Sequence, residues 1–78
     1  MQYITADIGI ASVLLTKGFK LTGMNKNNPK RVFFEFKEEE NMDQCLMAYT
    51  NGQCEVDAYT FYSNLKMLKN RIANFELN

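Results

Sequence analysis

The chain has no histidine and no tryptophan among its 78 residues, and it has only two cysteines, four glycines and one proline. Without histidine it lacks the commonest general base, the usual partner of a catalytic serine or cysteine, and the commonest metal ligand. The glycines, at positions 9, 18, 23 and 52, are isolated from one another, so the sequence has no glycine-rich loop of the kind that holds phosphates. These absences argue against an enzyme, and they predict no catalytic, cofactor or metal site.

Long apolar segments are also absent. No run approaches the roughly 18 consecutive apolar residues of a membrane span, and the N-terminus does not place a basic segment before an apolar one as a signal peptide does. We therefore expect a cytoplasmic protein with no membrane partner, in which Cys45 and Cys54 are reduced thiols. A disulfide between these two cysteines is the less favoured alternative.

The composition is that of a small globular domain. Apolar residues make up 46% of the chain, aromatic residues 13% and charged residues 23%. A chain of this length buries only roughly 60% of its unfolded surface, so a single domain covering 1–78 has a thin core. Such a core gains stability from an oligomer or from a bound partner, and we expect a homodimer.

Nine basic and nine acidic residues give a net charge of zero, but the two signs are separated along the sequence. Basic residues dominate before Glu35, acidic residues dominate from there to Asp57, and basic residues dominate again in the last segment. A neutral total is therefore compatible with a surface that has patches of opposite charge.

One strand organises the expected fold. Segment 31–37 contains three of the six phenylalanines, and successive side chains of a strand point to opposite faces. The residues expected on its core face are Val32, Phe34 and Phe36. Segment 19–24 alternates in the same way, and the polar segment 25–30 between the two favours a turn, so we expect an antiparallel hairpin.

Helical spacing and end signals predict the remaining elements. Thr5 is expected to cap the first helix and Gly18 to end it, with Phe19 folding back on the last turn. Asp57 is expected to cap the last helix. The elements expected in chain order are a short strand at 2–4, a helix at 6–17, strands at 19–24 and 31–37, and helices at 40–50 and 57–76. The prediction is an α+β domain of order β-α-β-β-α-α, with its helices on one face of a small antiparallel sheet.

The last helix carries two different faces. Its apolar seam is expected to pack across the sheet, and it consists of Phe61, Leu65, Leu68, Ile72 and Phe75. Its outer face carries an aromatic-basic stripe at helical spacing, consisting of Tyr59, Tyr62, Lys66 and Lys69, with Arg71 nearby. Lysines can follow a phosphate backbone while tyrosines stack on bases, so the stripe is a candidate nucleic-acid face. The alternative, which the sequence favours, is that the tyrosines are half-buried and the lysines are ordinary solvent residues.

The face of the sheet that points away from the helices, the outer sheet face, is the second candidate surface. The residues expected to form it are Lys20, Met24, Arg31, Phe33 and Lys37. An open face with exposed Phe33 suits a homodimer or a protein partner, which we favour over a nucleic-acid stacking platform. The remaining alternative is that the N-terminal segment covers this face.

The acidic stretch from Glu35 to Asp57 is the third candidate surface, because an acidic patch can engage a basic partner such as a host nucleic-acid enzyme. The leading hypothesis from the sequence is a non-enzymatic protein that binds a macromolecular partner and forms a homodimer. The two alternatives are a nucleic-acid-binding protein and an acidic inhibitor.

Five segments together resemble a family of small uncharacterised proteins from bacteria, phages and prophages, defined as a domain of unknown function. They are Asp7 to Gly18 running into Phe19-Lys20-Leu21, Val32-Phe33-Phe34-Glu35-Phe36, Tyr49-Thr50-Asn51-Gly52, Val56-Asp57-Ala58 and Leu68-Lys69-Asn70-Arg71-Ile72. The family brings no catalytic residues. The resemblance implies a phage or prophage setting inside a bacterial host.

Overall fold

A computed structural model describes the backbone of residues 1–26 and 31–77 and the side chains of residues 1–26 and 31–74. The elements are β1 (Gln2–Thr5), α1 (Ile8–Thr16), β2 (Leu21–Asn25), β3 (Phe33–Lys37), α2 (Met42–Thr50) and α3 (Ala58–Leu77). They confirm the predicted α+β fold and its order β-α-β-β-α-α. The turn predicted at 25–30 lies largely outside the described residues, as does the side chain of Phe75.

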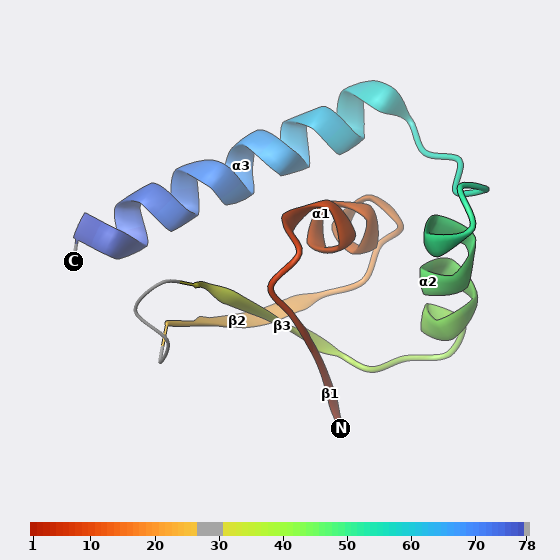
Figure 1. Cartoon of the computed structure of the whole chain (residues 1–78), viewed down its shortest axis with the longest axis horizontal. Coiled ribbons are helices and arrows are strands. Elements are labelled where there is room, and N and C mark those ends of the chain that lie inside the picture. The colour runs from red at the N-terminus through yellow and green to blue at the C-terminus, as the bar shows by residue number, and fades with distance from the viewer. Residues whose placement is uncertain (27–30, 78) are drawn as a thin grey trace.

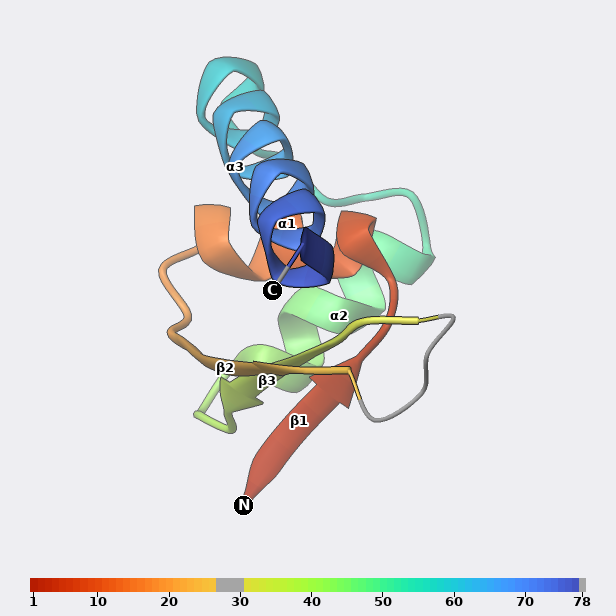
Figure 2. The same ribbon diagram turned by 90° about the vertical axis from the view of Figure 1, so that its left-hand side faces the viewer.

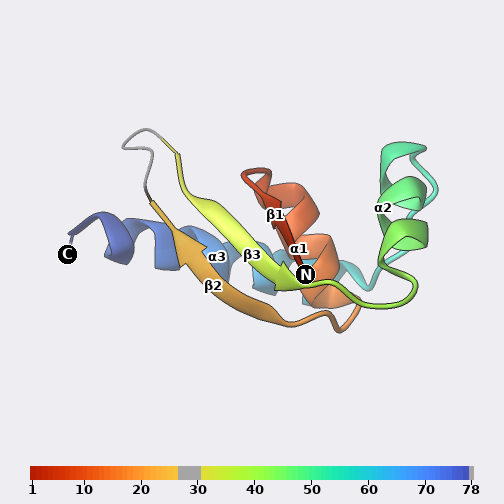
Figure 3. The ribbon, with the colours of Figure 1, turned by 90° about the horizontal axis from the view of Figure 1, so that it is seen from below.

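β3 is the central strand of the sheet, and both neighbouring strands run antiparallel to it. Tyr3 of β1 and Leu21 of β2 both lie opposite Phe36, one on each side. Phe34 and Phe36 are fully buried against the helices, as the alternation of segment 31–37 predicts. α1 and α3 lie on one side of this sheet and α2 lies beyond its end, and the other side of the sheet is open in the view from below (Figure 3).

α1 lies between the sheet and α3, so the molecule has three layers (Figures 1 and 2). The apolar seam of α3 was expected to cross the sheet directly, and this expectation is wrong, because α3 packs mainly against α1. The reason is that α1 is apolar over most of its circumference and buries two opposite sides. Its residues Ala11, Val13 and Leu14 are almost completely inaccessible to solvent. Leu68 of α3, also fully buried, belongs to the same core cluster as Phe34.

The first helix begins with a different cap from the one expected. Asp7, and not Thr5, is the N-cap of α1, because its Oδ1 accepts hydrogen bonds from the backbone N–H groups of Gly9 at 2.8 Å and Ile10 at 3.1 Å. The Thr5 hydroxyl accepts a hydrogen bond from the backbone N–H of Asp7 instead, at 3.1 Å. A carboxylate two residues further along the chain therefore replaces the hydroxyl as the cap.

The end of α1 follows the prediction. Gly18 has a φ of +97°, and the backbone N–H of Phe19 donates to the Leu14 carbonyl at 2.9 Å. α2 ends in the same way, with Gly52 at a φ of +71° and the backbone N–H of Gln53 donating to the Ala48 carbonyl at 2.8 Å. Both turns are left-handed caps that reverse the chain direction.

β2 contains a β-bulge, which corrects the predicted position of Met24. Leu21 lies opposite Phe36, but Gly23 lies opposite the next residue of β3, so one extra residue enters the strand at Thr22. Because one inserted residue exchanges the two faces of a strand, Met24 turns inward. It lies opposite Phe34 and packs against the core, and it does not belong to the outer sheet face.

Candidate functional site

α3 presents the aromatic-basic stripe because its N-terminus is capped and its opposite side is buried. The side chain of Asp57 accepts hydrogen bonds from the Thr60 hydroxyl at 2.7 Å and from the Thr60 backbone N–H at 2.9 Å, which confirms the predicted cap. These two bonds, the hydroxyl bond first, lower the pKa of Asp57. With Leu68 buried against α1 and the core, the face half a turn away points to solvent.

The two tyrosines of the stripe are exposed and not half-buried. Tyr59 is 80% exposed and Tyr62 is 58% exposed, and the described lysines Lys66 and Lys69 beside them are exposed as well. The Lys66 ammonium lies 5.4 Å from the centroid of the Tyr62 ring, within the range of a cation–π contact. The structure therefore contradicts the half-buried tyrosines of the alternative, and it leaves two flat aromatic side chains in contact with water.

Arg71 lies on a different side of α3 from the stripe. It is exposed, and together with Lys66 it lines a shallow hollow of about 390 Å³ along the second half of the helix. The other lining residues are Ser63, Met67, Asn70 and Asn74. Two cations and three neutral polar side chains can hold an oxyanion such as a phosphate beside the stripe.

The outer sheet face is open and more polar than expected. Lys20, Arg31 and Lys37 are exposed, but Phe33 is half-buried. Polar side chains bridge the strands across this face: the Gln2 amide donates to the Thr22 hydroxyl at 3.3 Å, and that hydroxyl donates to the Glu35 carbonyl at 3.0 Å. The alternative that the N-terminal segment covers this face is wrong, because residues 2–5 form the edge strand β1 and extend the sheet.

Sequence reasoning missed Ile4 on this face. Ile4 is 52% exposed and lies opposite Glu35 of β3. The alternation of β1 could have indicated its position: Tyr3 and Thr5 face the core, so Ile4 between them faces outward. The apolar part of the outer sheet face thus consists of Ile4 and Phe33, which lie diagonally across the pair of strands.

The acidic stretch is exposed where α2 begins. The exposed carboxylates are Glu38, Glu39, Glu40 and Asp43. Charged residues are ordinarily found at the surface, so exposure alone gives these residues no special role. Among the side chains that the structure describes, no cluster of three or more acidic or cysteine residues is arranged to hold a metal ion.

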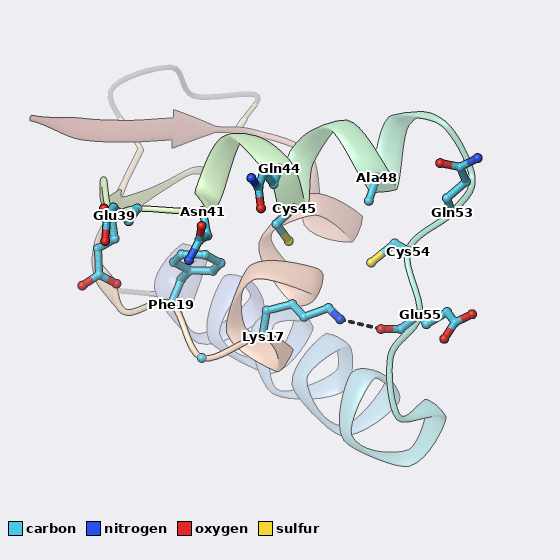
Figure 4. Close-up of a pocket in the computed structure, with 12 residues that line it drawn as sticks. Lys17, Phe19, Glu39, Asn41, Gln44, Cys45, Ala48, Gln53, Cys54 and Glu55 are labelled. Carbon is cyan, nitrogen blue, oxygen red and sulfur yellow. Dashed lines mark hydrogen bonds between the residues drawn. The ribbon is translucent and has the colours of Figure 1, made fainter.

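A second hollow, the cysteine groove, lies between the end of α1, α2 and segment 53–55, and has a volume of about 620 Å³. Cys45 of α2 and Cys54 of the connecting segment line it from different elements, and both are half-buried free thiols (Figure 4). Cys45 lies within the helix predicted at 40–50. The sequence contains no signal for the proximity of Cys54, since that depends on how the segment after Gly52 returns along α1.

The comparisons with known proteins place the chain in one family. No curated protein and no solved structure matches it. No helix in the described part of the chain combines the length and the apolar character that a membrane crossing requires. Residues 1–74 match the family described as Domain of unknown function (DUF5659), and the chain therefore belongs to that family.

Proposed function

We propose that the protein acts by binding and not by catalysis, and that its ligand is single-stranded nucleic acid held on the aromatic-basic stripe of α3. The setting we propose is that of a phage or prophage accessory protein in the cytoplasm of its bacterial host, as the resemblance of the sequence implies. The observation that carries the proposal is the exposure of Tyr59 and Tyr62 beside Lys66 on one face of α3.

The exposed tyrosines favour single strands over duplexes. In a duplex each base already stacks on its neighbours, whereas an unpaired base has a free face that can stack on a tyrosine ring. Stacking of this kind contributes about 1–3 kcal/mol per base. Tyr59 and Tyr62 are three residues apart, so they lie on one face of the helix about one turn from each other.

The charges near the stripe support the same ligand. Segment 58–74 contains Lys66, Lys69 and Arg71 and no acidic residue, so this part of the surface is positive although the whole chain is neutral. Three cations are few for a nucleic-acid-binding protein, and we therefore expect weak binding that depends on salt.

Binding of labelled single-stranded DNA and RNA oligonucleotides, followed by fluorescence anisotropy at low salt, tests the proposal. Replacing Tyr59 or Tyr62 by alanine is expected to weaken binding by roughly 5- to 100-fold, because one base loses its stacking partner. Met47→Ala is the matched control, since Met47 is 66% exposed on α2 and far from the stripe in sequence. Absence of binding by the wild-type chain, or equal losses in Met47→Ala, contradicts the proposal.

A second proposed function is homodimer formation through the outer sheet face. It is favoured by two apolar side chains on this face, the exposed Ile4 and the half-buried Phe33. This face has no covering element among the described residues, and it carries Lys20 and Lys37 together with Glu35. A two-fold axis brings the same face of two copies together, so lysines of one copy can pair with the glutamate of the other. The occupant proposed for this face is a second copy of the chain.

Light scattering over about 1–100 µM protein tests the homodimer, a range that brackets the Kd of modest interfaces. We expect a dimer, and we expect Ile4→Ser and Phe33→Ser each to shift the equilibrium toward the monomer. Tyr59→Ser is the control, because it removes an exposed aromatic side chain on a different surface. A wild-type chain that remains monomeric at every concentration rules this second function out.

A further inference from the structure

The two cysteines of the chain line the cysteine groove from two different elements. Cys45 lies on α2, and Cys54 lies on the segment that leads from α2 to α3. Figure 4 shows both sulfur atoms pointing into the groove, one from α2 and one from the segment that follows it. Neither thiol takes part in a disulfide, and the proposed binding surfaces use neither of them.

The position of Cys54 is fixed on both sides of the residue. On one side, the backbone N–H of Gln53 donates to the Ala48 carbonyl of α2 at 2.8 Å, which completes the left-handed turn at Gly52. On the other side, the Lys17 ammonium donates to the Glu55 carbonyl at 2.6 Å (Figure 4). The segment is therefore tied to α2 and to the end of α1, and the Cys54 thiol is held beside the helix that carries Cys45.

We propose that Cys45 and Cys54 form an oxidative modification site, in which hydrogen peroxide converts the two thiols into an intramolecular disulfide between α2 and the segment before α3. The thiolate of one cysteine attacks peroxide, which gives a sulfenic acid and releases hydroxide. The thiolate of the other cysteine then attacks the sulfenic sulfur, which forms the S–S bond and releases a second hydroxide. Two electrons pass from the thiols to peroxide, and the two thiol protons and the two hydroxides become two water molecules.

The environment of Cys45 assigns the order of the two steps. Burial raises the pKa of the Cys45 thiol, the neighbouring Cys54 raises it further, and Lys17 opposes both effects in part. Because the thiolate is the reactive form, Cys45 reacts slowly with peroxide. Cys54 is therefore the residue that is oxidised first, and Cys45 is the residue that completes the disulfide.

The disulfide closes a short loop over the turn at Gly52 and restrains the segment that enters α3. Since Glu55 is exposed just after Cys54, cleavage by a glutamate-specific protease at this position reports local opening of the segment. We expect the disulfide to slow this cleavage roughly 10-fold or more, because Glu55 directly follows the residue that the cross-link ties to α2 and can then move away from it less often.

The experiment exposes the full wild-type chain, dilute enough to prevent contacts between copies, to a small excess of hydrogen peroxide without reductant. Mass spectrometry should show the loss of two hydrogen atoms per chain and its reversal by dithiothreitol. Chymotrypsin cleaves after Tyr49, between the two cysteines, so its fragments should stay joined only in the oxidised chain. Sulfinic acid or disulfides between chains as the first products would overturn the proposal.

Single substitutions separate the roles of the two thiols and of the hydrogen bond from Lys17 to the Glu55 carbonyl. Cys45→Ser should leave a Cys54 sulfenic acid that dimedone traps, whereas Cys54→Ser should give little trapped product. Lys17→Met removes the hydrogen bond to the Glu55 carbonyl and should slow disulfide formation roughly 3- to 10-fold, because Cys54 is then less well oriented and the pKa of Cys45 rises without the Lys17 charge. Lys20→Met is the matched control. Equal rates in the Lys17 and Lys20 variants contradict the positioning of Cys54.

Discussion

At the scale of one residue, Gly9 of α1 allows the close approach of Tyr49 from α2. A Cβ atom added at Gly9 would lie 2.7 Å from the Tyr49 hydroxyl of α2 and 3.1 Å from Oδ1 of Asp7, the atom that caps α1. Gly9 therefore makes room for Tyr49, and the contact joins α2 to the first turn of α1. The sequence marks Gly9 only as an isolated glycine, because the need for it arises from a residue forty positions away.

Gly9→Ala is expected to lower the free energy of unfolding by about 1–3 kcal/mol, the usual cost of overpacking. In a helix without this contact, the same change would raise stability by about 1 kcal/mol. Urea denaturation measures the difference. The double variant Gly9→Ala/Tyr49→Phe should recover much of the loss, because it removes the hydroxyl that clashes, and Tyr49→Phe alone is the control. A more stable Gly9→Ala chain would contradict the prediction and show that the Tyr49 side chain moves aside at little cost.

Asp57 gives a prediction about pH. The hydrogen bonds from Thr60 lower its pKa in the folded chain, so the cap stabilises the protein at pH values above the unfolded pKa. This contribution is lost as the pH falls through the folded pKa. Thr60→Val removes the hydroxyl donor but keeps the backbone donor, and it should raise the pKa of Asp57 toward its ordinary value. An NMR titration of the Asp57 carboxyl carbon measures the shift.

Thr50→Val is the control for this titration, because Thr50 lies at the end of α2 and makes no described contact with Asp57. Asp57→Asn should also remove the contribution of this one carboxyl to the change of stability in the acidic range. A pKa of Asp57 that is the same in the Thr60→Val and wild-type chains would assign the shift to another cause.

At the scale of the element, strand alternation, the end of α1 and the start of α3 could be predicted, but the start of α1 and the strand register could not. Gly18 and Asp57 cap their helices as predicted, because a cap depends on neighbouring residues. At the start of α1 two neighbouring side chains can act as a cap, and the structure uses Asp7 and not Thr5. The bulge at Thr22 depends on pairing with β3, and it exchanges the faces of every residue that follows it. Alternation alone therefore placed Met24 on the wrong face.

Met24→Ala tests this register. Met24 is half-buried in contact with the core, so we expect a loss of about 1–2 kcal/mol in the free energy of unfolding, less than the 2–5 kcal/mol of a fully buried methionine. Lys37→Ala on the outer sheet face should change stability by less than about 0.5 kcal/mol. Equal effects of the two substitutions would mean that Met24 faces outward after all.

At the scale of the molecule, the fold class followed from the sequence, but the stacking of the helices did not. α1 is apolar over most of its circumference, which predicts that it is buried. The sheet covers one side of α1, so a second element must pack against the other side. That element is α3, and the face of α3 that carries Tyr59 and Tyr62 therefore points to solvent. The spacing of the stripe was visible in the sequence, whereas its exposure depends on this three-layer arrangement.

The central claim is that the cations and tyrosines of α3 bind single-stranded nucleic acid, and the salt dependence of binding tests it most directly. The measurement compares the wild-type chain with Lys66→Glu/Lys69→Glu and with Lys20→Glu/Lys37→Glu, a control with the same change in charge on the outer sheet face. With Lys66 and Lys69 each contacting a phosphate, the logarithm of the wild-type association constant should fall against the logarithm of the salt concentration with a slope of about −1.4. The α3 variant should lose most of the affinity and of the slope, and the control should keep both. Loss of binding in the control with retention in the α3 variant would contradict the account.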